Sequence, residues 1–321
     1  MLTGLPLNKL LAADAVQFKT GRCLRHRFRL STCERCISAC PHQAIAWTPE
    51  GLKRDDIACD GCHLCTACCP TGAFGAEGFS AVALVRELEK PDQPVIGCNR
   101  GKEAKGHVHL PCLGLLADAE LLLAIRLATG KAITLNLSAC CGCSNLGITA
   151  PLASAVNRQN SLGDGLPGEI RMVVDAESIQ FEETSCSRRE LFSLARRKAG
   201  EQVASMVHRL QENWGGQSYA QKALPLGRML LLQVLTLVDA TTRNTVEQRL
   251  FPAIVFADNC RQCTGCIGVC PTGALVPGKE TGSITFLPHR CTACGLCSEF
   301  CSAGAVSVTQ PMPEENFGLQ A

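Results

Sequence analysis

Closely spaced cysteines, whose thiolates can bind metals, occupy both ends of this 321-residue chain, which contains 23 cysteines. Near the C-terminus, two runs share the spacing C-x2-C-x2-C-x3-C: Cys260, Cys263, Cys266 and Cys270, and then Cys291, Cys294, Cys297 and Cys301. The N-terminal group contains this run once in full: Cys59, Cys62, Cys65 and Cys69. Neighbouring thiols in such runs converge on a metal more easily than they bridge one another, so the spacing predicts metal-binding loops.

Each run fits a cubane [4Fe–4S] cluster, in which each of four irons needs one thiolate. Three cysteines two residues apart wrap a loop around three corners, whereas the fourth lies on the following turn and points toward the cluster of the partner run. This crossing predicts two C-terminal ligand sets: Cys260, Cys263, Cys266 and Cys301; and Cys291, Cys294, Cys297 and Cys270. Zinc accepts paired C-x2-C motifs, but it does not need three consecutive steps with a crossed fourth ligand.

The C-terminal runs resemble the two-cluster bacterial ferredoxin family over roughly fifty residues. Proline follows the fourth cysteine at Cys270-Pro271, as in that family, whereas Ser302 follows Cys301. The resemblance implies a small module that carries electrons on two [4Fe–4S] clusters.

The N-terminal group departs from this pattern in its first half. Cys33, Cys36 and Cys40 keep the later spacing, but Leu30 stands where the first cysteine is expected, and the nearest candidate is Cys23, beyond a seven-residue insertion. With Cys23 included, crossing predicts two further sets: Cys23, Cys33, Cys36 and Cys69; and Cys59, Cys62, Cys65 and Cys40. A three-iron cluster or a ligand other than cysteine is the alternative at this corner.

The insertion is basic, because arginines crowd the segment from Arg22 to Arg29. Cations near a cluster stabilise its reduced form and raise its potential. The segment is therefore predicted to tune a cluster or to provide a docking site for an acidic redox partner. A solvated basic loop is the alternative.

Between the two groups, short apolar strands alternate with a helix, which is typical of a small α/β domain. Strands are predicted at 94–97, 107–110, 132–137 and 170–175, and a helix at 115–129. Loops after strands are where α/β folds usually place sites. Five cysteines follow the ends of the predicted strands: Cys98, Cys112, Cys140, Cys141 and Cys143.

The P-C-x-G motif that starts at Pro111 and the C-C-G-C motif that starts at Cys140 resemble the small iron–sulfur (delta) subunit family of methyl-viologen-reducing hydrogenases. The resemblance implies a fifth cluster, of the [2Fe–2S] type, on Cys98, Cys112, Cys143 and one of Cys140 or Cys141. A redox-active dithiol, a zinc site or simply buried cysteines are the alternatives.

The predicted fold class is α+β, with two ferredoxin-like 2[4Fe–4S] modules flanking a small α/β domain and a helical segment. The predicted domains are an N-terminal module at 1–90, a cysteine-rich α/β domain at 91–180, a helical segment at 181–250 and a C-terminal module at 251–321. Helices are predicted from Ser187 and over 226–240, and a polar loop at 157–168.

Composition and missing motifs narrow the function. A net charge of +2 and an aromatic content of 4% argue against a nucleic-acid-binding surface. The chain has no G-x-G-x-x-G fingerprint after a strand to support a nicotinamide or flavin site. The longest apolar stretch, 229–238, is too short to span a membrane. No signal peptide is visible, so a cytoplasmic protein with reduced thiols is predicted.

Together these features predict a polyferredoxin-type electron-transfer subunit of an oxidoreductase complex. Such a subunit relays electrons between a catalytic redox partner and an acceptor rather than catalysing a reaction itself. The Cys-Cys-Gly segment at Cys140 also resembles motifs of heterodisulfide reductases, whose cluster cleaves a disulfide. An enzyme with thiol chemistry at the middle cysteines is therefore the alternative.

Overall fold

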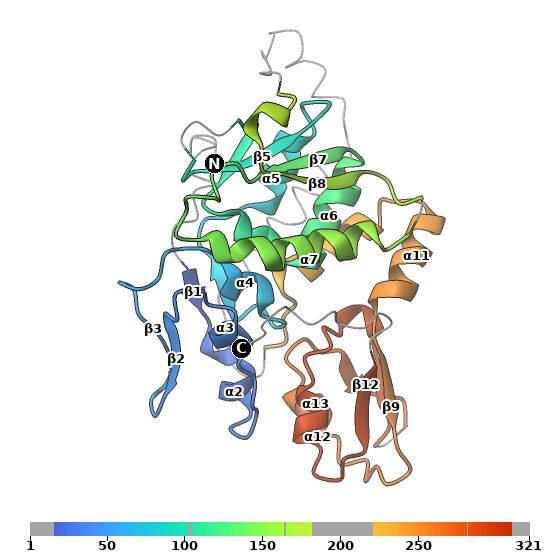
Figure 1. The fold of residues 1–321 in the computed structure, drawn as a ribbon. Helices are drawn as coiled ribbons and strands as arrows, with labels where there is room; N and C mark the ends of the chain where they lie inside the picture. Colours follow the sequence, from blue (N-terminus) through green and yellow to red (C-terminus); the bar gives the residue numbers. More distant parts are fainter. Residues whose placement is uncertain (1–15, 102–104, 164, 182–220, 281, 310–321) are drawn as a thin grey trace, which may run out of the picture.

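The computed structural model describes residues 16–101, 105–163, 165–181, 221–280 and 282–309. This part of the chain forms an N-terminal module, an α/β domain and a C-terminal module (Figure 1). In Figure 1 the two modules lie beside each other below the α/β domain, the N-terminal module in blue and the C-terminal module in orange and red. Segments from opposite ends of the sequence are therefore neighbours in space.

The N-terminal module, residues 16–78, consists of two antiparallel strand pairs and short helices. Its first strand, β1 Val16–Phe18, pairs with its last, β4 Phe74–Ala76, and β2 Ile45–Thr48 pairs with β3 Gly51–Arg54. Gly51 has a φ of +115°, which residues with a side chain rarely adopt, and it opens the return strand of this hairpin. The helices are η1 Thr20–Arg22, α2 Leu24–Arg27, α3 Arg35–Ser38 and α4 Leu64–Cys68.

The C-terminal module, residues 253–309, repeats this order of strands. Its first strand, β9 Ala253–Phe256, pairs with its last, β12 Val306–Thr309, and β10 Leu275–Pro277 pairs with β11 Ile284–Phe286. The helices are α12 Gly265–Val269, η6 Pro288–Arg290 and α13 Leu296–Phe300. In both modules the outer strands pair with each other and enclose a central hairpin.

The α/β domain is built on a parallel sheet with the strand order β6-β5-β7-β8. The strands are β5 Val95–Cys98, β6 Val108–Leu110, β7 Ala132–Asn136 and β8 Glu169–Val173. Every residue of β5 is buried, as expected for an inner strand of a parallel sheet. The helical elements are α5 Ala81–Leu88, η2 Leu113–Ala117, α6 Ala119–Thr129, η3 Leu146–Ile148, α7 Thr149–Asn160 and η4 Ala176–Ser178.

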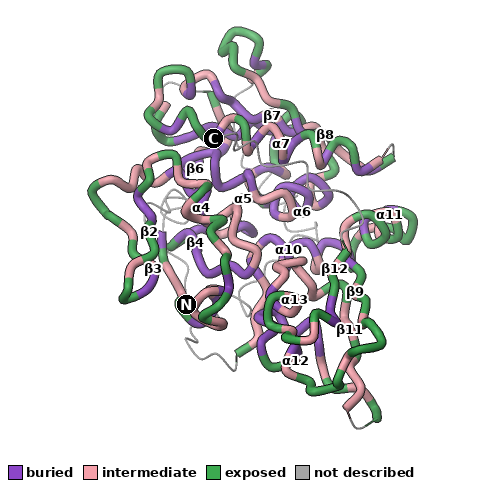
Figure 2. Tube along the Cα trace, turned by 60° about the horizontal axis from the view of Figure 1, so that its bottom comes forward, coloured by how far each residue is buried: buried purple, intermediate pink, exposed green. Residues whose placement is uncertain are grey.

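The largest apolar core joins this sheet to helices from both flanking segments. Helix α5 comes from the segment before the sheet and α10 Leu226–Leu235 from the segment after it, and both pack into that core. Figure 2 shows α10 as mostly buried and α11 Ala240–Leu250 as mostly exposed. The α/β domain is thus larger than its strands alone indicate.

The strands lie close to their predicted positions, but the helices differ. The helix expected at 115–129 is divided, because the Asp118 carboxylate accepts two backbone N–H groups and starts α6 anew. The helix expected at 226–240 ends at Leu235, and Asp239 caps α11 in the same way. The loop expected at 157–168 is partly helical, since α7 continues to Asn160.

The helix expected from Ser187 lies outside the described residues. Of the helices that the structure describes, none has the length and apolar character needed to cross a membrane.

Candidate iron–sulfur sites

Four cysteines of the C-terminal module line one small cavity, of about 20 Å³. They are the crossed set that the spacing predicts, and we call them site 3: Cys270, Cys291, Cys294 and Cys297. Burial and the neighbouring thiols raise the pKa of Cys294 to about 12 and that of Cys297 to about 11. Thiols that raise one another's pKa in this way suit a shared iron core, whose positive charge stabilises all the thiolates together.

Cys270 is the exception in this set, because its environment favours the thiolate. Burial opposes ionisation, but the Thr272 hydroxyl and backbone N–H groups lower the pKa of Cys270. Thr272 Oγ1 lies 3.7 Å from Cys270 Sγ. The turn that follows Cys270 therefore favours the thiolate form, which is the form that binds iron.

The same turn follows the last cysteine of all four runs. A buried alanine lies four residues after that cysteine, and in three runs its N–H donates to the sulfur: Ala44 to Cys40 at 3.3 Å, Ala73 to Cys69 at 3.2 Å and Ala305 to Cys301 at 3.3 Å. In the fourth run the N–H of Ala274 contributes to the lowered pKa of Cys270. The residue before each alanine has a positive φ: Gln43, Gly72, Gly273 and Gly304. The repeated tail thus builds an N–H···S hydrogen bond, which stabilises a thiolate.

The loops through the first three cysteines also share an uncommon backbone. In three runs the residues on either side of the second cysteine have positive φ: Gly61 and His63, Gln262 and Thr264, and Ala293 and Gly295. Alternation between right- and left-handed residues turns successive N–H groups toward one concave side, where an anionic cluster is stabilised. The Cys33–Cys36 loop has no such residue, in keeping with its interrupted run.

The structure brings Cys23 to the incomplete run. Burial raises the pKa of Cys23, and the nearby Cys69 and Cys33 raise it further. Burial also raises the pKa of Cys36, to about 12, with the same three cysteines adding to it. We call this set site 1: Cys23, Cys33, Cys36 and Cys69.

A second set in the N-terminal module lies directly beside site 1. We call it site 2: Cys40, Cys59, Cys62 and Cys65. Burial raises the pKa of Cys62 to about 11, with Cys40 and Cys59 adding to it. Burial also raises the pKa of Cys65, and its neighbours include the site 2 thiols and Cys36 of site 1.

The remaining predicted set of the C-terminal module reaches the surface. We call it site 4: Cys260, Cys263, Cys266 and Cys301. Cys266 is buried near Cys263 and Cys260, whereas Cys263 is exposed. Asn259 Nδ2 donates to the carbonyl oxygen of Ala303 at 2.8 Å, which ties the first loop to the turn after Cys301.

The middle cysteines converge at the carboxyl ends of β5, β6 and β7. Burial raises the pKa of Cys112 to about 12 and that of Cys140 to about 11, and Cys98 lies near both. Cys143 also lies near Cys140. Cys140 is buried and Cys141 is exposed, which favours Cys140 as the ligand. We call Cys98, Cys112, Cys140 and Cys143 the middle site.

The middle site abuts site 2. Cys62 is among the groups that raise the pKa of Cys112. A Cβ atom on Gly114 would lie 2.2 Å from the carbonyl oxygen of Cys62, so only glycine allows this approach. Gly114 belongs to the P-C-x-G motif, which explains why that motif needs a glycine.

Two polar residues that the sequence analysis missed hold this contact. Arg100 pairs with Asp60 at 2.5 Å and lowers the pKa of its carboxyl group. Asn145 is buried, its Nδ2 donates to the Asp60 carbonyl oxygen at 3.1 Å, and its N–H donates to Cys143 Sγ at 3.4 Å. In the sequence, the one feature that could have pointed to Arg100 and Asn145 is that each stands two residues after a candidate ligand. Within the described ranges, no three cysteine, histidine or acidic side chains are grouped to hold a single metal ion.

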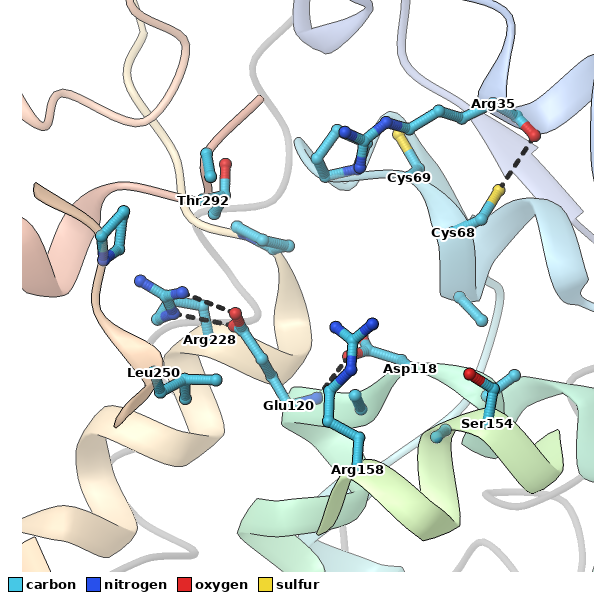
Figure 3. Close-up of a pocket in the computed structure, with 18 residues that line it drawn as sticks. Arg35, Cys68, Cys69, Asp118, Glu120, Ser154, Arg158, Arg228, Leu250 and Thr292 are labelled. Carbon is cyan, nitrogen blue, oxygen red and sulfur yellow. Dashed lines mark hydrogen bonds and ion pairs between the residues drawn. The ribbon is translucent and has the colours of Figure 1, made fainter. Parts of the chain in front are cut away.

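A larger cavity, of about 150 Å³, lies where both modules meet the α/β domain (Figure 3). Figure 3 shows Asp118, Glu120, Arg158 and Arg228 around it, with Glu120 hydrogen-bonded to the guanidinium group of Arg228. Arg228 is buried, and its Nη2 lies 2.5 Å from Glu120 Oε1. Cys69 is the one candidate ligand in the wall, so this cavity is a polar junction rather than another cluster site.

The basic insertion makes most of its contacts inside the molecule. Arg22 is buried, Arg25 pairs with Glu34 at 3.2 Å, and Arg27 donates to the C-terminal module. Arg29 is exposed. Most of the positive charge in this segment is therefore used inside the molecule, and the predicted docking site for an acidic partner has no support here.

Two comparisons with known proteins find iron–sulfur and hydrogenase relatives of parts of this chain. Residues 252–305 match a family model described as a 4Fe-4S dicluster domain. A 47-residue segment, 15% of this chain, is 36% identical to hydrogenase-4 component A of Escherichia coli (strain K12), and it covers 23% of that relative. No solved structure matches the chain. The chain is an iron–sulfur protein.

This iron–sulfur protein has a role in electron transfer, and its [4Fe–4S] dicluster domain contains sites 3 and 4. This chain spans less than a quarter of the length of that relative.

Proposed function

We propose that this iron–sulfur protein is a relay subunit of an oxidoreductase complex, which passes electrons between a catalytic redox partner and an acceptor. A bound [4Fe–4S] cluster supplies a one-electron carrier. The chain contributes the placement of these carriers. The abundance of free thiols suits a reducing compartment, which supports a cytoplasmic location.

The observation that carries this proposal is that neighbouring sites touch. Each of the four adjacent pairs has cysteines that interact or share an apolar cluster: Cys112 with Cys62, Cys65 with Cys36, Cys33 with Cys294, and Cys270 with Cys266. The proposed order is therefore the middle site, site 2, site 1, site 3 and site 4. A row of this kind suits transfer between two separate partners, one at each end.

The N-terminal module is proposed to hold two [4Fe–4S] clusters as well. Its strand pairing repeats that of the dicluster domain. The alanine carbonyls after the four runs also accept equivalent backbone bonds: Lys19 to Ala73, Asp55 to Ala44, Ala257 to Ala305, and Leu287 to Ala274. The middle site offers four more thiols, and we propose a [2Fe–2S] cluster there.

Iron and acid-labile sulfide per chain, measured on anaerobically purified protein with Mössbauer spectra, test this cluster content. Four cubanes require about 16 irons, and a [2Fe–2S] cluster raises the total to about 18. A total near 8 would restrict the clusters to the C-terminal module and overturn the relay. A total near 16 without a two-iron signal would remove the middle cluster alone.

The second candidate is an enzyme with thiol chemistry at the middle site, and exposed Cys141 favours it. Replacing Cys141 with Ala distinguishes the two functions. Loss of disulfide turnover with unchanged iron content would favour the enzyme. Unchanged electron transfer to an artificial acceptor, with no disulfide turnover in either protein, would favour the relay.

A further inference from the structure

An apolar contact joins the two modules at helix α2, inside the insertion. Leu24 packs with Val269 and Leu296 of the C-terminal module in one buried cluster. Cys33 of site 1 and Cys294 of site 3 both pack against this cluster. Ligands of two different modules therefore border the same apolar cluster.

Two directional contacts fix the same seam. Arg27 Nε donates to the carbonyl oxygen of Val269 at 3.1 Å. The rings of Phe28 and Phe300 meet edge to face, with centroids 5.3 Å apart and an angle of 65° between the planes. An edge-to-face pair adds attraction beyond its buried area, and it also sets an orientation.

The insertion supplies a ligand and the docking helix in one segment, because Cys23 is the residue immediately before α2. Any movement of α2 away from the C-terminal module would therefore act on site 1 directly. The other side of α2 is engaged within its own module: Arg25 pairs with Glu34 and lies 4.4 Å over the Trp47 ring.

We propose that the segment 23–32, which contains the seven-residue insertion, is a built-in docking element that joins the two modules and makes the seam between sites 1 and 3 the crossing point for electrons. In each crossing, one electron leaves a reduced cluster in one module and reduces an oxidised cluster in the other, with no bond or proton moved. This inference rests on the proposed relay function.

The test compares two variants of the full-length, cluster-loaded protein after reduction with dithionite. Arg27→Ala with Phe28→Ala removes the two directional contacts across the seam and keeps Leu24, and Arg25→Ala changes the same helix at a side chain that contacts its own module. Iron and sulfide per chain are expected to stay at the wild-type value in both. Amide hydrogen exchange over 296–300 should become about tenfold faster in the double variant only, a loss of about 1.4 kcal/mol.

Electron paramagnetic resonance gives a second readout of the seam. In the reduced wild-type protein, the magnetic interaction between sites 1 and 3 should appear in addition to the interactions within each module. The double variant should lose the interaction between sites 1 and 3 and keep the interactions within each module. Phe300→Ala, which weakens the seam from the C-terminal side, should have the same effect without a change near Cys23.

Wild-type exchange and magnetic interaction in both seam variants would overturn the docking role. A wild-type protein with four reducible cubanes but no interaction between the modules would overturn the crossing point and leave the relay proposal standing. A wild-type protein without clusters in the N-terminal module would instead overturn the proposed function.

Discussion

Replacing Arg228 with Met is expected to destabilise the protein by about 4 kcal/mol. Arg228 is 2% exposed, and it binds both carboxylate oxygens of Glu120, at 2.7 Å and 2.5 Å. Its Nη1 also donates to the carbonyl oxygens of His289 and Cys291, at 3.0 Å and 2.6 Å. This side chain therefore ties α6 of the α/β domain to the ligand loop of site 3.

The size of the effect follows from these contacts. Removing one partner of a buried ion pair costs about 3–5 kcal/mol, because the other charge is left without compensation. Two carbonyl groups also lose a donor, at about 1 kcal/mol each. The Glu120 side chain is 22% exposed toward the junction cavity, and its partial hydration offsets some of this loss. Met fills much of the arginine stem's volume, so packing changes little.

Urea unfolding under anaerobic conditions, followed by circular dichroism and by the visible absorbance of the clusters, measures this change. Arg249→Met is the matched control, since Arg249 is exposed and its one hydrogen bond to a described residue goes to the Leu162 carbonyl oxygen at 2.6 Å. It should cost less than about 1 kcal/mol. Adding Glu120→Gln to Arg228→Met should restore about half of the loss, because the unpaired charge disappears. If the Arg228 variant is no less stable than the control, the ion pair is not what holds the module.

Three further predictions concern single positions. Gln43→Gly should raise the free energy of unfolding by about 0.5–1 kcal/mol, since a left-handed φ of +49° is strained for a residue with a side chain, and a less stable variant would refute this. Burial raises the pKa of Asp118 from 3.8 to about 7, so its contribution to stability is complete below 3.8 and is lost as the pH rises through 7. The free energy of unfolding, measured with urea, should therefore fall by about 1.4 kcal/mol between pH 6 and pH 8. Asp118→Asn, which still caps α6, should abolish this pH dependence. Cys23→Ser should lower the iron content by about one per chain and produce a three-iron signal, whereas Cys68→Ser should do neither; equal iron contents would refute Cys23 as a ligand.

Local spacing predicted the strands well, and it also predicts the ligand runs, whose assignments remain predictions. The two-residue steps between cysteines describe a loop whose shape depends on its own backbone, so the crossed set at the site 3 cavity could be predicted. Apolar strands such as β5 are recognisable because a buried parallel strand has little room for polar residues. The ligand assignments of all four ferredoxin-like sites remain predictions, although the four cysteines of site 3 line one cavity.

Helix ends and long-range packing were harder to predict. Asp118 lies inside an apolar run that fits helical spacing, yet its carboxylate competes for backbone N–H groups and divides the helix. The role of α2 depends on Val269, 242 positions further along the chain than Arg27. Nothing local to the insertion distinguishes a docking helix from a solvated basic loop, because the apolar partner is supplied by another module.

The exchanged ligand at site 3 has a consequence for assembly. Cys270 belongs to one run and lines the cavity of the other, so a cluster bound there closes a loop of about twenty residues. Closing this loop also brings Cys260, Cys263 and Cys266 closer to Cys301. Part of the conformational entropy that the second cluster would cost has therefore been lost when the first cluster binds. Loading of the C-terminal module should therefore be cooperative, with empty and fully loaded chains outnumbering chains that hold a single cluster. The two clusters of the C-terminal module should therefore be assembled together, in a single maturation step.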